Sequence, residues 1–175
     1  GAVKDLSRLG PRDGAALLQP IFEREGGRKG RLSAQTNPQL YRDAAAMTTH
    51  ARRLASIAPN MQVKIPATSA GIRAVEEATF HGVSVNTTVA FTVAQAVACA
   101  EAIERGLVRR EAAGLPTAEM APVCTLMVGR IEDWLEVLVE RDGVAVAPGA
   151  IPWAGVAVFK RAYGIFRERG FRARL

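Results

Sequence analysis

Met61-Gln62-Val63-Lys64-Ile65-Pro66-Ala67-Thr68 places one lysine in the middle of a short apolar run that predicts a buried strand. Side chains alternate along a strand, so Lys64 faces the side opposite to Val63 and Ile65. An ammonium among apolar neighbours costs free energy unless it is paired or loses its proton. Desolvation favours the neutral amine, the form that attacks a ketone to give a Schiff base. For this segment alone, the alternative is a lysine at a strand end that extends its head group to water.

The chain has 175 residues, of which 49% are apolar and 23% charged, so we expect residues 1–175 to form a single globular domain. Cys99 and Cys124 lie in apolar segments without metal-ligand spacing, and no signal peptide or membrane-length apolar run is evident. We therefore expect a cytoplasmic protein with free thiols and no membrane partner. Part of the net charge of +6 lies near the C-terminus at helical spacing, which predicts a solvated helix face and no nucleic-acid partner.

Segments of strand and helix character alternate along the chain, which predicts βα units and a parallel sheet. Besides the lysine strand, we expect strands at 31–37, 83–89 and 122–129, and helices at 13–25, 38–56, 69–81, 92–105, 131 onward and 155–169. No glycine-rich phosphate loop follows any strand, which weakens a nucleotide-binding sheet. Trp134 and Trp153 are expected to be packing residues.

Four successive strands each keep one polar face, whereas a doubly wound sheet is apolar on both faces. The alternate polar positions are Ser33, Gln35 and Asn37; Gln62 and Lys64; Ser84, Asn86 and Thr88; and Thr125 with Met127. A barrel whose interior becomes an active site at its C-terminal mouth has this pattern. We therefore predict an α/β fold of the parallel (β/α)8 TIM-barrel type, with this chain covering about the middle four to five βα units.

Four blocks of sequence resemble the transaldolase family of class I Schiff-base enzymes, with some character of fructose-6-phosphate aldolase. They are Gly30-Arg31-Leu32-Ser33-Ala34-Gln35; Val63-Lys64-Ile65-Pro66-Ala67-Thr68 with Ala70-Gly71-Ile72; Val85-Asn86-Thr87-Thr88 with Phe91-Thr92-Val93-Ala94-Gln95-Ala96; and Val128-Gly129-Arg130-Ile131-Glu132-Asp133-Trp134. They occur in the family's order and at its spacing.

The resemblance implies a role for each matching residue. Lys64 matches the Schiff-base lysine, Asn86 the asparagine that holds substrate hydroxyls, and Thr88 the threonine that helps to place the catalytic water. Thr125 stands where the family has a serine. Arg130 matches the arginine that binds the substrate phosphate, a task that suits its charge and fork geometry. No metal or organic cofactor is implied, because the iminium itself is the electron sink.

Two residues depart from the family pattern. Gln35 replaces the glutamate that serves, through a water, in proton transfer in transaldolases, and an amide can only fix that water. Glutamine is the residue of the fructose-6-phosphate aldolase branch. Met127, in contrast, stands where that branch has a catalytic tyrosine and transaldolases have phenylalanine. The chain matches neither branch cleanly.

By the resemblance, the chain begins after the family's second barrel strand and stops entering the seventh. The strands outside it would supply an aspartate, an asparagine and a further arginine. We therefore expect missing segments or a homo-oligomer to complete the barrel. Three functions remain open: transaldolase-like transfer of a dihydroxyacetone unit between sugar phosphates, fructose-6-phosphate aldolase-like cleavage, and sugar-phosphate binding without turnover.

Overall fold

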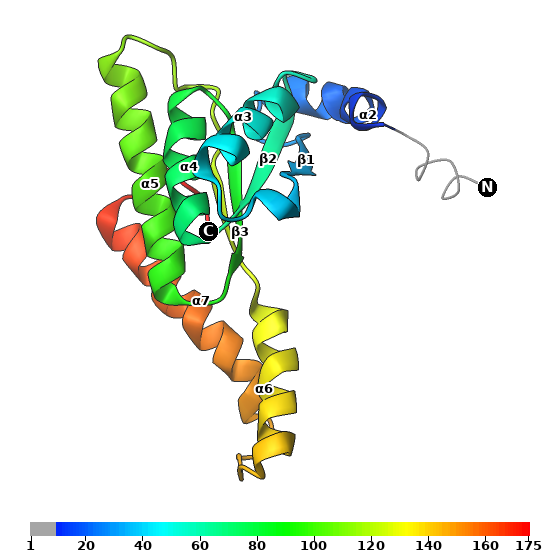
Figure 1. Ribbon diagram of the computed structural model, residues 1–175, viewed down its shortest axis with the longest axis vertical. Helices are drawn as coiled ribbons and strands as arrows, with labels where there is room; N and C mark the ends of the chain where they lie inside the picture. Colours follow the sequence, from blue (N-terminus) through cyan, green and yellow to red (C-terminus); the bar gives the residue numbers. More distant parts are fainter. Residues whose placement is uncertain (1–9) are drawn as a thin grey trace, which may run out of the picture.

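The computed structural model describes residues 10–175, in which four strands form one parallel sheet with the order β1-β2-β3-β4 (Figure 1). The strands are β1 (Leu32–Gln35), β2 (Met61–Pro66), β3 (Val85–Ala90) and β4 (Val123–Leu126). The helices are α2 (Pro11–Arg24), the 3-10 helix η1 (Pro38–Leu40), α3 (Ala44–Ala55), α4 (Ser69–Phe80), α5 (Val93–Ala112), α6 (Val128–Asp142) and α7 (Ala150–Arg169). Strand order follows chain order with no switch point, as in a βα barrel and unlike a doubly wound sheet. The predicted fold class is confirmed.

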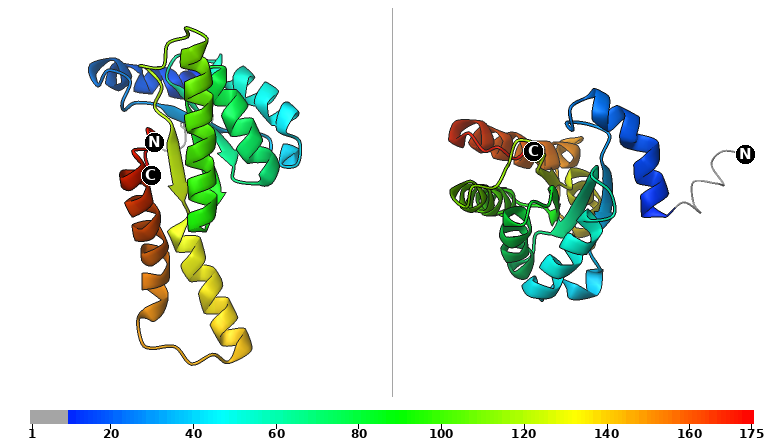
Figure 2. Two further views of the ribbon diagram at one scale, coloured as in Figure 1. Left: turned by 90° about the vertical axis from the view of Figure 1, so that its left-hand side faces the viewer. Right: turned by 90° about the horizontal axis from the view of Figure 1, so that it is seen from above.

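Helices α3, α4 and α5 pack side by side against one face of the sheet, as the view from above shows (Figure 2). Val63 and Ile65 are fully buried beneath them, and Val85 of β3 is as well. Because side chains alternate along a strand, Lys64 belongs to the other face. It is only partly buried. The alternation predicted for the lysine strand is therefore present.

The segment after α7 returns to the edge of β4. Val123 and Arg174 form a parallel bridge, in which the Cys124 amide donates to the Arg174 carbonyl at 2.7 Å. The Arg174 amide in turn donates to the Pro122 carbonyl at 3.1 Å. This isolated bridge lies outside the four strands of the sheet, at the point where the chain was expected to enter a further barrel strand.

Helix α5 is longer than predicted, because Gly106 does not end it. A Cβ at Gly106 would lie 2.6 Å from the Glu76 carbonyl oxygen and 2.7 Å from the Thr79 Cβ. The glycine is therefore needed where α5 crosses α4 closely, and the helix continues to Ala112. A glycine at a helix crossing and a glycine at a helix end look the same in the sequence.

Other predicted boundaries also moved. β4 ends at Leu126 because α6 begins at Val128, so residues 127–129 do not extend the strand. The helix predicted over 38–56 is divided into η1 and α3, and Asp43 caps α3 by accepting from the Ala46 amide at 2.9 Å. The last helix begins at Ala150 rather than Gly155, with a proline in its first turn, where a missing amide hydrogen costs little.

The expectation that both tryptophans are packing residues was wrong. Helices α6 and α7 lie side by side and project away from the sheet (Figures 1 and 2). Trp134 is 66% exposed and Trp153 is 70% exposed on this pair. The two helices approach closely at Gly155 instead, where a Cβ would lie 2.9 Å from the Val128 carbonyl oxygen.

Candidate active site

Three predicted site residues lie at one level across the sheet. Gln35 of β1 pairs with Lys64 of β2, and Lys64 pairs with Asn86 of β3. This level falls at the C-terminal end of β1, inside β2 and near the start of β3, because neighbouring strands are offset along the sheet. The parallel register therefore brings three residues that are far apart in the sequence into one row across the sheet.

The main chain at Lys64 is held firmly, whereas its amine has no protein partner among residues 10–175. The Lys64 carbonyl accepts a hydrogen bond from Gln35 Nε2 at 3.2 Å and one from the Thr36 hydroxyl at 3.2 Å. None of the hydrogen bonds or ion pairs within the described part of the chain includes Lys64 Nζ. A half-buried amine without a carboxylate beside it is available to react with a carbonyl compound.

The orientation of the Asn86 amide is set by β4. Thr125 donates its hydroxyl hydrogen to Asn86 Oδ1 at 2.8 Å. This bond assigns the oxygen of the amide to Thr125, so that Asn86 Nδ2 remains as a donor on the face that carries Lys64. A pair arranged in this way can donate a hydrogen bond to a substrate hydroxyl oxygen.

Thr88 and Met127 meet farther toward the C-terminal ends of β3 and β4. Thr88 is buried and pairs with Pro66, two positions beyond the Lys64 level. Its hydroxyl lies 3.9 Å from Met127 Sδ, and a thioether is only a weak acceptor. The Thr88 hydroxyl therefore keeps most of its capacity to bind a water.

Arg130 stands apart from this row, in the first turn of α6. Its guanidinium bonds Asp133 Oδ2 at 3.1 Å, and both side chains are more than 60% exposed. The pair lines an open hollow of about 480 Å³ at the junction of β4 and α6. An exposed ion pair of this kind contributes little free energy, so an anion can displace Asp133 at small cost.

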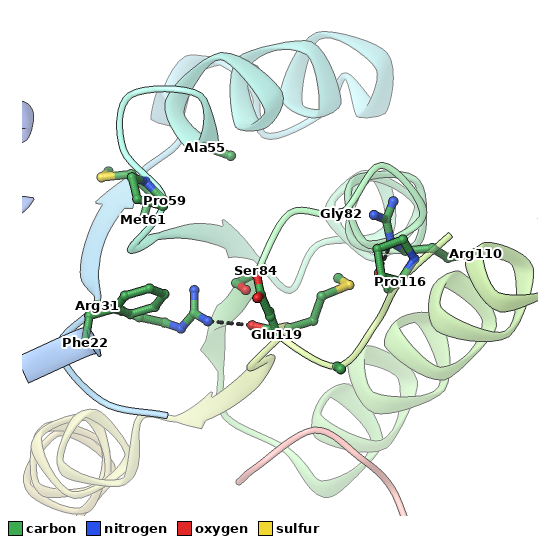
Figure 3. A pocket seen from close by; sticks show the side chains of 12 residues that line it. Phe22, Arg31, Ala55, Pro59, Met61, Gly82, Ser84, Arg110, Pro116 and Glu119 are labelled. Carbon is green, nitrogen blue, oxygen red and sulfur yellow. Dashed lines mark hydrogen bonds between the residues drawn. The ribbon is translucent and has the colours of Figure 1, made fainter. Parts of the chain in front are cut away.

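A second cavity, of about 410 Å³, lies at the opposite ends of the strands (Figure 3). Arg31 and Arg110 face it from opposite sides, and Ser84 lies between them. The Arg31 Nη2 group donates to the Glu119 carbonyl oxygen at 2.6 Å, and Arg110 Nη1 donates to the Phe80 carbonyl oxygen at 3.0 Å. None of the predicted site residues lines this cavity.

Sequence analysis assigned no role to Gln95. In the structure its side-chain amide contacts the ends of two strands, with Nε2 3.2 Å from the Ala67 carbonyl oxygen and 3.4 Å from that of Val89. The signal available in the sequence was the Thr92-x-x-Gln95 spacing of a capping box. This spacing identifies a helix start, but it does not indicate a contact with Ala67, which lies 28 residues earlier in the chain.

A parallel sheet in chain order, with helices on one face and polar side chains on the other, defines a βα-barrel type of protein. The family model described as Transaldolase/Fructose-6-phosphate aldolase matches residues 4–175. The chain belongs to this family.

Curated relatives agree with this assignment. The chain is 32% identical to Transaldolase 1 of Streptomyces avermitilis, over 95% of this chain and 45% of that protein. It is 35% identical to the transaldolase of Thiobacillus denitrificans, over 90% of this chain and 44% of that protein. A shorter match to the transaldolase of Neisseria gonorrhoeae is 39% identical, over 65% of this chain and 33% of that protein. The chain thus matches between a third and a little under half of the length of these relatives.

Two features are absent from the described residues. No helix within 10–175 is both long and apolar enough to cross a membrane. The same residues contain no group of three or more His, Cys, Asp or Glu side chains placed to hold a metal ion.

Proposed function

We propose that this chain carries the Schiff-base portion of a transaldolase-type site, in which Lys64 forms an iminium with the ketone of a sugar phosphate. The observation that carries the proposal is the row of Gln35, Lys64 and Asn86 at one register level. The row places an unpaired amine beside an amide that can bind hydroxyl groups. Membership of the Transaldolase/Fructose-6-phosphate aldolase family supports the same chemistry.

In this mechanism the Lys64 amine adds to the ketone carbon, and loss of water gives the iminium. The C3–C4 bond then breaks, with its electron pair moving into the iminium to leave an enamine on Lys64 and a free aldehyde. The hydroxyl proton lost in that step passes to a base through a water, which Thr88 would hold. Asn86, oriented by Thr125, would donate to a substrate hydroxyl, and Arg130 would exchange Asp133 for the substrate phosphate.

The fate of the enamine separates two reactions. A transaldolase adds the enamine to a second aldehyde phosphate, whereas an aldolase protonates it and releases dihydroxyacetone by hydrolysis. Neither Gln35 nor Met127 can donate a proton readily, because one is an amide and the other a thioether. Slow protonation of the enamine favours transfer to an aldehyde, so we propose transfer as the main reaction and cleavage as the alternative.

Binding without turnover is the second candidate function. It is favoured by Gln35, whose amide is bonded to the Lys64 carbonyl and cannot relay a proton as a glutamate would. In that case Arg130 and Asn86 would hold a sugar phosphate while Lys64 stays unmodified.

One assay separates the three outcomes. The protein is incubated with fructose 6-phosphate, alone and with an aldose phosphate, and the products are identified by mass spectrometry. We expect a new ketose phosphate only when the acceptor is present, and none from Lys64→Met. Lys29→Met is the matched control, because Lys29 is exposed and pairs with Glu25. Free dihydroxyacetone would indicate the aldolase, and calorimetric binding without product would indicate the binding protein. The proposal is refuted if the protein gives no product and also binds no fructose 6-phosphate.

A further inference from the structure

The backbone beside Thr88 is strained. Val89 has φ of 55°, and it is the one non-glycine residue of the described range with a positive φ. This conformation is costly for a β-branched residue, and it accompanies the register shift between Thr87 and Ala90 where β3 pairs with β4. Strained conformations persist only where surrounding contacts hold them. The contacts that hold Val89 therefore also hold the end of β3.

Gln95 supplies such contacts from the first turn of α5. Its Nε2 group donates to the Val89 carbonyl at 3.4 Å and to the Ala67 carbonyl at 3.2 Å. Val89 follows Thr88 directly, and Ala67 lies three residues after Lys64, just beyond the end of the neighbouring strand β2. The Ala67 amide also donates to the Thr88 carbonyl at 2.7 Å. A single side chain thus links the ends of β2 and β3 to each other and to a helix.

We propose that Gln95 is a positioning residue of this site, and that its Nε2 group fixes the placement of Thr88 relative to Lys64. The inference rests on the proposed function, since it concerns how the two groups come to act on one substrate. Gln95 acts only through Ala67 and Val89. Catalytic groups must be held within a fraction of an ångström of their working geometry, so loss of this link lowers the rate.

A helix cap is the competing role for Gln95, and the two roles use different atoms. The cap uses Gln95 Oε1, which accepts from the Phe91 amide at 3.0 Å and from the Thr92 hydroxyl at 3.3 Å. The positioning role uses Nε2. Gln95→Glu keeps the capping oxygen, since glutamate suits a capping box, but turns a second oxygen toward the two carbonyl groups. This variant therefore removes the link and keeps the cap.

The experiment measures the rate at which fructose 6-phosphate and borohydride modify Lys64. We expect Gln95→Glu to lower that rate roughly tenfold, with a melting temperature within about 3 °C of wild type. Adding Val89→Gly should restore much of the rate, because glycine adopts a positive φ without strain. Gln39→Glu is the matched control: it adds the same charge after the end of β1, and its side chain makes no hydrogen bond with a described residue. If Lys64 in Gln95→Glu is modified at the wild-type rate, the proposal is overturned.

Amide hydrogen exchange gives a readout that does not depend on reactivity. In Gln95→Glu we expect roughly tenfold faster exchange at Ala67 and at Met127, whose amide donates to the Ala90 carbonyl at 2.9 Å. The Val63 amide, bonded to the Ser84 carbonyl at 2.9 Å in the middle of β2, should be unchanged. If wild-type protein gives no adduct, the proposed function fails, and unchanged exchange at Ala67 and Met127 would separately refute the role of Gln95.

Discussion

Replacement of Gly71 by alanine tests how helix α4 is seated on the lysine strand. A Cβ at Gly71 would overlap the Pro66 carbonyl oxygen and would also lie 3.1 Å from Thr68 Oγ1. Cβ atoms keep at least 3.0 Å from such neighbours, and a strand carbonyl cannot rotate away as a side chain can. Helix α4 must therefore shift away from β2, two residues after Lys64.

The magnitude follows from two opposing effects. Alanine is favoured over glycine inside a helix by about 1 kcal/mol. Overpacking costs about 1–3 kcal/mol, and the overlap with backbone places Gly71→Ala at the upper end of that range. The net loss is about 2 kcal/mol, which corresponds to a fall in melting temperature of roughly 4–8 °C for a chain of this size.

The assay is thermal and urea unfolding followed by circular dichroism, with Gly164→Ala as the matched control. Gly164 lies in α7, and a Cβ there would meet no atom within 4 Å. Helix propensity alone then acts, and the control should gain about 0.5–1 kcal/mol. If Gly71→Ala is as stable as wild type, or gains as much as the control, the close seating of α4 on Pro66 is wrong.

Three further predictions concern other parts of the molecule. Thr125→Val removes the donor to Asn86 Oδ1 and should lower the free energy of unfolding in urea by about 1 kcal/mol. The control Thr117→Val loses an exposed hydrogen bond to Glu111 and should stay within about 0.5 kcal/mol of wild type. Equal effects of the two substitutions would contradict the role of the Asn86–Thr125 pair. Burial raises the pKa of Glu76, but hydrogen bonds from Arg105 and Arg109 outweigh it, so that the pKa lies below the ordinary value of 4.5. The stabilisation by Glu76 is then complete above pH 4.5 and is lost as the pH falls through its folded-state pKa, so Glu76→Gln should flatten the acid limb of the stability profile; an unchanged acid limb would contradict the role of the two arginines. Burial raises the pKa of Cys99 to about 11 and that of Cys124 to about 12, so both thiols should react with a disulfide reagent at pH 8 only as fast as the protein unfolds; rapid labelling without urea would show that they are not buried.

The sequence was sufficient for features that depend on alternation along a strand. The two faces of β2 followed from the position of Lys64 between Val63 and Ile65, and the parallel sheet followed from alternating segments. The residues paired across the sheet could not be derived, because register depends on how neighbouring strands align. Gln35, Lys64 and Asn86 could thus be assigned to a polar face, but their shared level is a result of the structure.

Long-range and close contacts were the features that sequence analysis missed. The helix predicted over 92–105 stops short at Gly106, because a glycine gives no sign in the sequence of the helix that crosses it. The exposure of Trp134 and Trp153 depends on how α6 and α7 pair, which their apolar character did not indicate. Gln95 had the spacing of a cap, and its second role arises only once α5 lies beside the ends of β2 and β3.

The central claim is that Lys64 forms a Schiff base with a ketose phosphate, and borohydride trapping followed by peptide mass mapping tests it most directly. The chain contains four lysines, Lys4, Lys29, Lys64 and Lys160, so an adduct can be assigned to one peptide. We predict that fructose 6-phosphate and borohydride modify Lys64 and leave the other three unmodified. An adduct spread evenly over all four lysines, or none on Lys64 in protein whose circular dichroism confirms folding, would contradict the claim.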